Sequence, residues 1–452
     1  MTHDELLVHL SSAVKESCRL DKELFEKFDV KRGLRNKDHT GVLVGLTNIG
    51  DVKGYNKTDK GLEPIEGKLF YRGMDVEEIC KGFLKDRRQG FEESTYLLLS
   101  GKLPNKNELD AFNSLLASKR DLTSSFVKNM ILSLRGRDIM NMLSRSVLAL
   151  YTLDKYADDI SRENILRQSI SLIAKFPVII AYAYHGMMHA YHRGELVVRH
   201  PNPLLSTAEN FLYLLKGEDN WTKSEAQILD LALVLHAEHG GGNNSTFVMR
   251  VTSSSGTDTY ASTASAIASL KGPLHGGANL MVEEMMTNIK ANVKDWENDR
   301  EVRDYLMKIL RKEAFNGSGK IYGIGHAIYT LSDPRAIILK ESARKLAQEK
   351  GKLAEYELYE RVERLAPEAF AEFKGGASDK VVCANVDFYS GFVYSAIGIP
   401  EEVFTPVFAM SRMAGWAAHR LEELNFEQKR IIRPAYKNVY PATNYTQIDN
   451  RG

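Results

Sequence analysis

The sequence predicts an almost wholly α-helical (all-α) fold in two domains, with one small β-hairpin towards the N-terminus. Three observations lead to this prediction. The chain has 452 residues, which is too long for one small core and suits two domains. Apolar residues recur at three- and four-residue spacings, for example in residues 225–236 and 405–424, as on helices. Only residues 41–73, rich in Gly and β-branched residues with short alternations, predict a hairpin.

The composition is that of a soluble globular protein without a strong overall charge. Hydrophobic residues make up 43% of the chain and charged residues 26%. The formal net charge is +1, from 60 basic and 59 acidic residues, so no global field attracts nucleic acid or an anionic membrane. Anion binding must therefore rest on local clusters of Arg. The sequence has no strand–Gly-rich loop–helix unit and does not support a nucleotide-binding α/β fold.

Cysteine content and the N-terminal sequence predict a cytoplasmic protein. The three cysteines, Cys18, Cys80 and Cys383, lack CxxC spacing, so we expect a reducing compartment and no disulfide framework. The first residues carry acids and no apolar core with a cleavage site, so we expect no signal or transit peptide. The apolar run at residues 176–184 is too short to span a bilayer.

Three histidine-bearing turns follow one another in the second half of the chain. In the first, LHAEHGGGNNST, we expect a helix to run to about His236 and to stop at the glycines of residues 240–242, because Gly tolerates positive φ. His239 lies just before that stop. Taken alone, it is interpreted as a histidine placed favourably at a helix C-terminus.

The second turn, KGPLHGGAN, predicts a histidine at a helix N-terminus. Pro273 ends one helix, and a new helix is expected from about Ala278. The helix dipole then lowers the pKa of His275 and favours its neutral ring, whose N–H can donate to a carbonyl oxygen that becomes enolate-like. A histidine that caps backbone N–H groups is an equally weighted alternative for this turn alone.

The third turn, YGIGHAIYTLSDPRA, combines a histidine with a helix start. Gly323 and Gly325 bracket a tight loop that presents His326. Asp-Pro-Arg at residues 333–335 predicts an Asp N-cap, Pro at the first helical position and Arg in the first turn. The helix dipole disfavours Arg335 there unless an anion lies nearby, so this turn indicates anion binding.

One acidic residue and two arginines follow in apolar surroundings. In VVCANVDFYSG, Asp387 is either paired with a base or raised in pKa and ready to act as a general base, and the alternative is a helix N-cap. Arg412 lies on an otherwise apolar helix, and Arg433 precedes a proline. Buried Arg is rare without a carboxylate or phosphate partner, so both arginines indicate an anionic partner.

Two histidine pairs have a spacing that could bind a metal ion. His185 and His189 are four residues apart, and His236 and His239 are three apart. Neither pair has the intervening Glu of HExxH or an evident third ligand. We therefore predict no metal site and interpret His185 and His189 as core or surface residues.

Taken together, these motifs resemble those of the citrate synthase family. They occur in the family's order and approximate spacing: LHAEHGGGNNSTF, GPLHGGAN, GIGHAIY with DPRA, NVDFYSG, FAMSRMAGWAAH and RIIRP. The earlier segments GKLFYRGMDVEEI and FEESTYLLLSGKLP are similar too, so the resemblance spans about residues 41–440. One such motif is a weak signal, but six in order are highly specific.

The resemblance implies a helical fold with a large and a small domain, in a two-fold dimer. With joints at the glycine turns of residues 276–277 and 390–391, residues 277–391 form the small domain. Residues 1–276 and 392–452 then form the large one. The resemblance also implies condensation of acetyl-CoA with oxaloacetate and hydrolysis of the thioester. No cofactor is expected, because the CoA thioester is itself a substrate.

The resemblance further implies a role for each candidate residue. Asp387 removes a methyl proton from acetyl-CoA while His275 holds the thioester oxygen, and His326 binds and protonates the ketone of oxaloacetate. The residues implied to hold the substrate carboxylates are His239, Arg335, Arg412 and, from the partner subunit, Arg433. The residue implied to orient neighbouring groups is Asn385. The loop implied to pass close to the CoA adenine consists of Tyr322, Gly323, Ile324 and Gly325.

Two alternative functions stay open. A 2-methylcitrate synthase would use propionyl-CoA with the same residues, and one methylene changes discrimination by only about 1–3 kcal/mol. A catalytically inactive helical dimer that serves as a binding scaffold is the alternative from another class. The intact set of His275, His326 and Asp387 argues against the scaffold.

Overall fold

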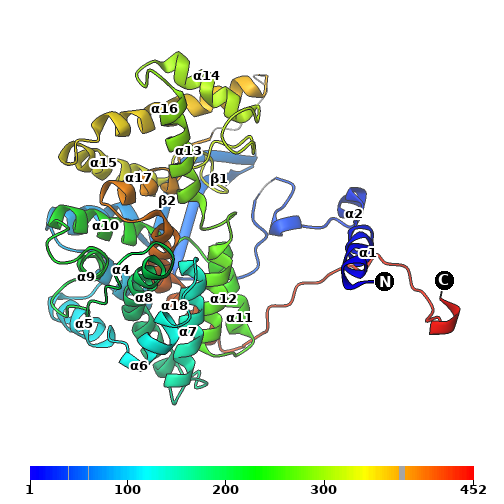
Figure 1. Ribbon diagram of the computed structural model, residues 1–452, viewed down its shortest axis with the longest axis horizontal. Coiled ribbons are helices and arrows are strands. Elements are labelled where there is room, and N and C mark those ends of the chain that lie inside the picture. The colour runs from blue at the N-terminus through cyan, green and yellow to red at the C-terminus, as the bar shows by residue number, and fades with distance from the viewer. Residues whose placement is uncertain (39, 60, 376–381, 452) are drawn as a thin grey trace. The chain divides into compact units, whose positions relative to one another are not determined.

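The computed structural model describes residues 1–38, 40–59, 61–375 and 382–451 of the chain (Figure 1). It divides into two units, Met1–Thr47 and Asn48–Gly452. The first unit consists of α1 (His3–Ser17), α2 (Lys22–Lys27) and the short 3-10 helix η1 (Arg32–Leu34). A capping box begins α1, because the N-cap side chain and the Glu side chain three residues on bond to each other's backbone N–H.

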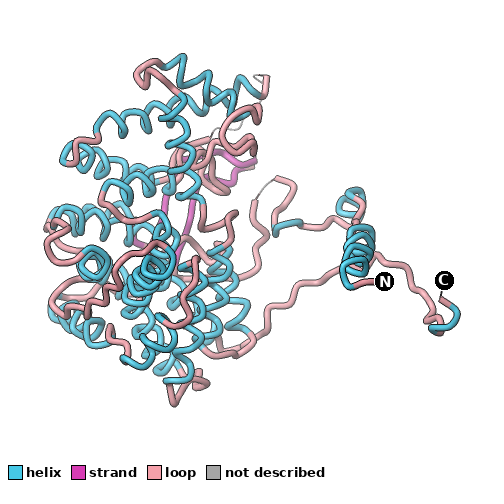
Figure 2. The backbone as a smooth tube through the Cα atoms, viewed as in Figure 1, coloured by secondary structure: helices cyan, strands magenta, loops and turns pink. Residues whose placement is uncertain are grey.

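The predicted hairpin is confirmed in the second unit, with narrower bounds than residues 41–73. Strands β1 (Gly50–Thr58) and β2 (Gly61–Tyr71) pair antiparallel, and β3 (Met74–Asp75) adds two residues beside β2. The register of the hairpin shifts at Gly54, where it forms a bulge. Figure 2 shows the strands as a small magenta island among the cyan helices.

Helices make up most of the second unit, which confirms the predicted all-α class. The helices before residue 240 are α3 (Val76–Lys85), α4 (Phe91–Ser100), α5 (Lys106–Lys119), α6 (Ser124–Phe126), α7 (Ile139–Leu150), α8 (Arg162–Tyr191), α9 (Thr207–Lys216) and α10 (Lys223–His236). The helices after it are α11 (Asn244–Ser254), α12 (Thr259–Lys271), α13 (Ala278–Asn292), α14 (Asp299–Leu310), α15 (Pro334–Glu349), α16 (Leu353–Phe373), α17 (Val386–Ala396) and α18 (Phe404–Leu424). The short helices of other types are η2 (Val127–Leu132), η3 (Tyr151–Leu153), η4 (Glu401–Val403) and η5 (Ile448–Asn450).

The core of the second unit is built around α8 and α18, which pack against each other. Helix α18 is apolar on almost every side and buried over nearly its whole length, as such a helix must be. Pro406 lies in its first turn, where a missing N–H leaves no hydrogen bond unmade. Trp416, Arg412 and Arg420 of this helix are among the largest fully buried side chains. Two arginines therefore lie in the core, where each needs polar partners.

Helix α8 contains the apolar run of residues 176–184. The run alone is too short for a bilayer, but it belongs to a 30-residue helix that meets the length and hydropathy of a membrane span. Of the 18-residue window that qualifies, 78% is buried inside the protein. Such burial is typical of the core helix of a globular protein.

Helices α13 to α17 pack on one another within the second unit. Helix α14 packs against α13 and α16, and α17 packs against α13 and α15. Figure 1 shows these five helices together at the top of the unit. This grouping suits the predicted small domain of residues 277–391. The boundaries of the two predicted domains stay a prediction.

Candidate active site

The candidate residues lie mainly at helix ends. His239 follows α10, His275 precedes α13, and Arg335 and Asp387 lie in the first turns of α15 and α17. Arg412 lies within α18, and its charge acts on the pKa of His239, His275 and Asp387 alike. The fold therefore brings these five predicted residues into one region.

His239 is buried beside the predicted His326. Helix α10 ends at His236, as predicted, and Gly240 turns the chain with a φ of 80°. The ring centroids of His239 and His326 are 5.1 Å apart, edge to face. Burial and, next, the charge of Arg335 hold the pKa of His239 well below its ordinary value, so the ring is neutral. Its Nε2 is buried and has no hydrogen-bond partner among the described residues, so it can bond to a ligand.

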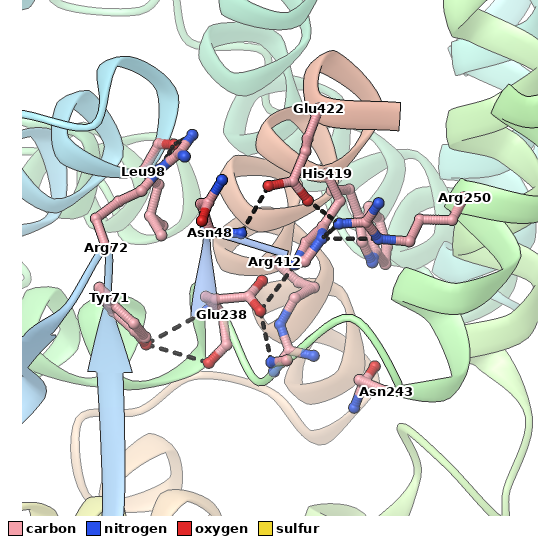
Figure 3. Close-up of polar contacts among 12 residues, drawn as sticks. Asn48, Tyr71, Arg72, Leu98, Glu238, Asn243, Arg250, Arg412, His419 and Glu422 are labelled. Atoms are coloured by element: carbon pink, nitrogen blue, oxygen red, sulfur yellow. Dashed lines mark hydrogen bonds and ion pairs between the residues drawn. The ribbon is translucent and has the colours of Figure 1, made fainter. Parts of the chain in front are cut away.

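A buried polar chain fixes the loop after α10 (Figure 3). Nε2 of His419, on α18, lies 2.9 Å from Oε1 of Glu238. Nδ1 of the same ring accepts from Nε of Arg250, on α11, at 3.0 Å. Because Nδ1 accepts, the ring proton lies on Nε2 and donates to Glu238. Arg250 also pairs with Glu422 of α18. The chain thus ties the loop to two helices at once.

Arg412 is the central cation of the site. It is fully buried, and its Nε donates to the backbone oxygen of His236 at 2.6 Å. Its Nη1 and Nη2 have no hydrogen-bond partner within the described part of the chain. Burial lowers the pKa of Arg412 to about 10, while the charge of Glu238 opposes that shift, so the guanidinium stays charged at neutral pH. Buried charged donors without a partner are costly, so this position favours an anionic ligand.

His275 is held by the first turn of α11. The backbone N–H of Ser245 donates to its Nε2 at 3.3 Å, and the Ser245 hydroxyl lies 3.0 Å from the same atom. Trp416 of α18 donates from Nε1 to that hydroxyl at 3.2 Å. Because Nε2 accepts, the proton of the neutral ring lies on Nδ1. Burial and, next, the charge of Arg412 lower the pKa of His275 to about 4. These two causes keep the ring neutral, as the prediction of a neutral hydrogen-bond donor requires.

His326 is presented by the turn that follows Gly325. Its Nδ1 accepts from the backbone N–H groups of Ile328 and Tyr329, both at 3.1 Å. In the neutral ring the proton therefore lies on Nε2, on the other side of the imidazole. The ring stacks on Tyr329, with the centroids 4.7 Å apart.

Arg335 has an anionic partner two residues before it. Asp333 is the N-cap of α15, as predicted, and its carboxylate binds Arg335 through Nε at 3.0 Å and Nη2 at 2.7 Å. The backbone N–H of Val386, in α17, donates to the same carboxylate at 3.3 Å. Burial lowers the pKa of Arg335, but the Asp333 carboxylate prevails and holds it above its ordinary value. Asp333 binds Nε and Nη2, so Nη1 of Arg335 takes no part in this ion pair.

Asp387 is a carboxylate with a raised pKa at the start of α17. The N-cap of this helix is Asn385, whose Oδ1 accepts from the backbone N–H of Asp387 at 3.0 Å. The alternative interpretation of Asp387 as the N-cap is therefore wrong. Burial raises the pKa of Asp387 to about 6, although Arg335 lowers it. A carboxylate of this pKa can take up a proton near neutral pH.

The predicted CoA loop pairs with the segment before α17. Ile324 and Ala384 form an antiparallel bridge, and Asn385 donates from Nδ2 to the backbone oxygen of Gly325 at 2.9 Å. Asn385 thus links the loop to the helix of Asp387, which agrees with an orienting role. Gly323, with a φ of 77°, cannot carry a side chain without strain. Tyr322 is half-buried and donates from its hydroxyl to a serine 3.2 Å away.

A pocket of about 410 Å³ opens beside this loop. The loop and the C-terminal end of α16 form its walls. The residues that line it are Ile324, Gly325, His326, Ala327, Pro367, Phe370, Ala371, Lys374 and Val382. The lining is mostly apolar, and Lys374 adds a positive charge, so the pocket suits a flat, partly anionic ligand.

Arg433 does not join this group. It is exposed, in a segment without helix or strand after α18. The N–H of Ile432 beside it donates to the hydroxyl of Ser254, the last residue of α11, at 3.0 Å. Ser245, which holds His275, lies at the other end of that helix, about 14 Å away at 1.5 Å per residue. The structure therefore places Arg433 at the far end of α11 from the candidate site of the same chain.

The two histidines of α8 have separate structural surroundings. His185 is buried and bonds through Nε2 to the backbone oxygen of Leu214 at 3.0 Å. His189 is exposed and bonds through Nδ1 to the backbone oxygen of Gly194 at 3.1 Å. The interpretation of these residues as core and surface is confirmed. Across the residues that the structure describes, no group of three or more His, Cys, Asp or Glu side chains is placed to hold a metal ion.

Several residues that hold the candidate site in place were not predicted from the sequence. These residues are Ser245, Glu238, His419, Tyr329 and Arg250. Four of them, all but Arg250, occur within the quoted motifs, but the sequence gives no sign of the contacts that they make. The clearest signal available was a carboxylate directly before His239 in an apolar segment, since buried Glu needs a partner.

Comparison with known proteins places this chain in a known family. The sequence profile "Citrate synthase, C-terminal domain" matches residues 38–435. The citrate synthase of Haloferax volcanii is 36% identical over 430 residues, which cover 94% of this chain and 99% of that protein. The citrate synthase of Deinococcus radiodurans is also 36% identical, over 82% of this chain and 89% of that protein.

Solved structures show the same similarity in three dimensions. The citrate synthase of Thermoplasma acidophilum, solved as a ternary complex with carboxymethyl coenzyme A and oxaloacetate, matches with a TM-score of 0.76 at 28% identity. That match covers 93% of this chain and 99% of the other. The citrate synthase of Pyrobaculum aerophilum matches with a TM-score of 0.73 at 32% identity, over 91% and 94% of the two chains.

These matches, with the helical fold, define an enzyme of the acyltransferase class. The chain belongs to the citrate synthase family.

Proposed function

We propose that the chain condenses acetyl-CoA with oxaloacetate and water to give citrate and CoA. The observation that carries this proposal is Arg412, whose Nη1 and Nη2 are buried without a partner in the described residues. Nε2 of His239 is buried and unpartnered in the same way. With Nη1 of Arg335, these groups supply the several donors that a dicarboxylate needs for orientation.

Enolisation of acetyl-CoA requires a base and an oxygen donor together, because a thioester methyl is a weak acid. Asp387, with a pKa of about 6, takes a methyl proton, and the C–H electron pair becomes the enolate. The N–H at Nδ1 of neutral His275 bonds to the thioester oxygen as charge develops there. Each of these two contributions is typically worth about 100- to 10,000-fold.

Condensation then joins the methyl carbon to the ketone carbon of oxaloacetate. The N–H at Nε2 of His326 bonds to the ketone oxygen and gives its proton to that oxygen as the carbon–carbon bond forms. The product is the CoA thioester of citrate. Water attacks its carbonyl carbon, the C–S bond breaks, and citrate and CoA are released. The reaction needs no cofactor beyond the two substrates.

The CoA thioester is proposed to lie along the loop of Tyr322, Gly323, Ile324 and Gly325. The pocket beside this loop supports the proposal, because its apolar wall from α16 can face the adenine ring. Lys374 can pair with a phosphate at the same wall. His326 also lines this pocket. A CoA molecule bound there would therefore have its thioester end close to the proposed oxaloacetate site.

We further propose a homodimer in which Arg433 reaches the partner's site and binds a carboxylate. Its position at the far end of α11 supports this, since it leaves Arg433 out of its own site. The helices of residues 277–391 are proposed to form the small domain, which closes on the substrates and excludes water. We also propose a cytoplasmic enzyme without membrane or nucleic-acid partners. The burial of α8 inside the protein supports only the lack of a membrane span.

Release of the CoA thiol tests the proposed reaction directly. The parent enzyme should release thiol from acetyl-CoA only when oxaloacetate is present, with an equal amount of citrate. Thiol release without oxaloacetate, or none with it, would overturn the proposal. Propionyl-CoA run in parallel tests the 2-methylcitrate alternative, which predicts faster release from propionyl-CoA than from acetyl-CoA. The reported relatives are all citrate synthases and lend that alternative no support.

A further inference from the structure

The β1–β2 hairpin lies tightly against the turn that carries His326. A Cβ at Gly54, the bulge residue of the hairpin, would overlap the backbone oxygen of Ile328. A Cβ at Gly67 would overlap the backbone oxygen of Ser332 and lie 2.7 Å from the Tyr329 ring. The backbone N–H of Gly67 also donates to the Ser332 hydroxyl at 3.1 Å. Only glycines allow this approach of strand to turn.

Tyr329 is the side chain through which this contact reaches the site. It is 1% exposed, and its hydroxyl donates to the backbone oxygen of Lys68, in β2, at 3.3 Å. Its ring stacks on His326 with the centroids 4.7 Å apart and meets the edge of His239 at 5.7 Å. The Arg335 guanidinium lies 5.8 Å from the same ring. One tyrosine thus contacts three of the candidate oxaloacetate ligands.

The two kinds of contact to His326 complement each other. Hydrogen bonds from the backbone of Ile328 and Tyr329 to Nδ1 fix the rotation of the imidazole within its plane. Stacking on the Tyr329 ring fixes the tilt of that plane. Nδ1 is held as an acceptor, so the ring proton lies on Nε2. The direction in which this N–H points therefore depends on where the hairpin holds Tyr329.

We propose that Tyr329, seated on the β1–β2 hairpin, is a positioning residue that aims His326 at the ketone of oxaloacetate. The inference rests on the proposed function, because it assumes that His326 is the proton donor. It gives the hairpin a role in catalysis, although the strands carry none of the reacting groups.

The test compares Tyr329→Leu with Tyr329→Phe. The Leu variant removes the ring and should lower kcat about 10- to 100-fold, because misplacement by about 1 Å costs this much. The Phe variant keeps the ring and loses one long hydrogen bond, so its kcat should stay within about fivefold of the parent. Gly67→Ala keeps Tyr329 in the chain, but the added Cβ would push against its ring and against the backbone of Ser332. This variant should therefore lower kcat as well.

A matched control separates positioning from folding. Tyr182, in α8, is a buried tyrosine whose hydroxyl donates to the backbone oxygen of Arg199 at 2.7 Å. Tyr182→Leu should lower the melting temperature as Tyr329→Leu does and leave kcat unchanged. Calorimetry should show that oxaloacetate still binds to the Tyr329→Leu variant, more weakly than to the parent.

The outcomes distinguish the inference from the function on which it rests. A parent enzyme that condenses the substrates, with a Tyr329→Leu variant of unchanged kcat, would overturn the inference alone. So would Phe and Leu variants of equal kcat, because the ring would then be irrelevant. A parent that neither binds oxaloacetate nor releases thiol would overturn the proposed function, and the inference with it.

Discussion

The backbone N–H of Ser245 donates to Nε2 of His275 at 3.3 Å. Thirty residues separate the two in the chain, and the first turn of α11 joins them. The bond fixes the tautomer, so that the other ring nitrogen, Nδ1, carries the proton. A histidine held in this way is a hydrogen-bond donor of fixed direction. Nδ1 is the atom that the proposed mechanism aims at the thioester oxygen.

The pKa values of the site set the pH dependence of the reaction. Asp387 must be ionised to act as base, and burial raises its pKa to about 6. Activity should therefore be full well above pH 6 and fall about tenfold for each unit below it. His275, with a pKa of about 4, stays neutral over this range. A profile of kcat/KM for acetyl-CoA against pH checks this, and a curve that is flat from pH 7 to pH 5 would contradict it.

Arg412 and Arg420 offer a matched comparison on one helix. Both are buried in α18, but Arg420 is satisfied by Ser253 and Ser262 at 3.0 and 2.8 Å, whereas Nη1 and Nη2 of Arg412 have no partner in the described residues. Arg412→Met should weaken oxaloacetate binding at least about 30-fold, as expected for loss of a buried charged partner. Arg420→Met should lower the melting temperature and leave the oxaloacetate Kd unchanged. Calorimetry that shows equal losses in both variants would speak against the assigned site.

The chain of Glu238, His419 and Arg250 predicts a difference between two substitutions of one residue. Gln has both a donor and an acceptor, so His419→Gln can still join Glu238 to Arg250, whereas His419→Leu cannot. The Leu variant should lose about 1.5–3 kcal/mol of unfolding free energy, because it removes one hydrogen-bond donor from a buried carboxylate. It should also raise the KM for oxaloacetate more than that for acetyl-CoA, because the chain supports His239. Equal stability and equal KM values in the two variants would rule out this role.

Mixing two inactive variants tests the shared site. Arg433→Ala and Asp387→Ala subunits, allowed to exchange, form mixed dimers in which one site carries both lesions and the other is intact. About half of the dimers are mixed at random, so activity should return to about a quarter of the parent's. If Arg433 served its own subunit, every site would carry a lesion. Absence of recovery, with exchange confirmed independently, would exclude the shared site.

The sequence was sufficient for the helices and for most of the residues that the structure brings together at the candidate site. Helix ends at His236 and Ala278 follow from Gly and Pro, whose backbone preferences are local. The resemblance to the family rests on short motifs as well, namely the histidine turns and their order in the sequence. The hairpin was also predicted, because its turn and alternation lie within one short segment.

The supporting contacts could not be predicted, because they join distant parts of the chain. His419 and Glu238 are 181 residues apart, and Tyr329 and Lys68 are 261 apart. No spacing rule connects such positions, and packing of α18 and of the hairpin decides them. The pKa of Asp387 depends in the same way on burial and on Arg335, which tertiary structure alone supplies.

Asp387→Asn offers the most direct test of the proposed reaction. The substitution keeps the shape of the side chain and removes the base. Thiol release with acetyl-CoA and oxaloacetate should fall by about 100- to 10,000-fold, while calorimetry shows oxaloacetate bound as tightly as in the parent. Turnover within a few-fold of the parent's, in a variant that still binds oxaloacetate, would contradict the role of Asp387 as the base that forms the enolate.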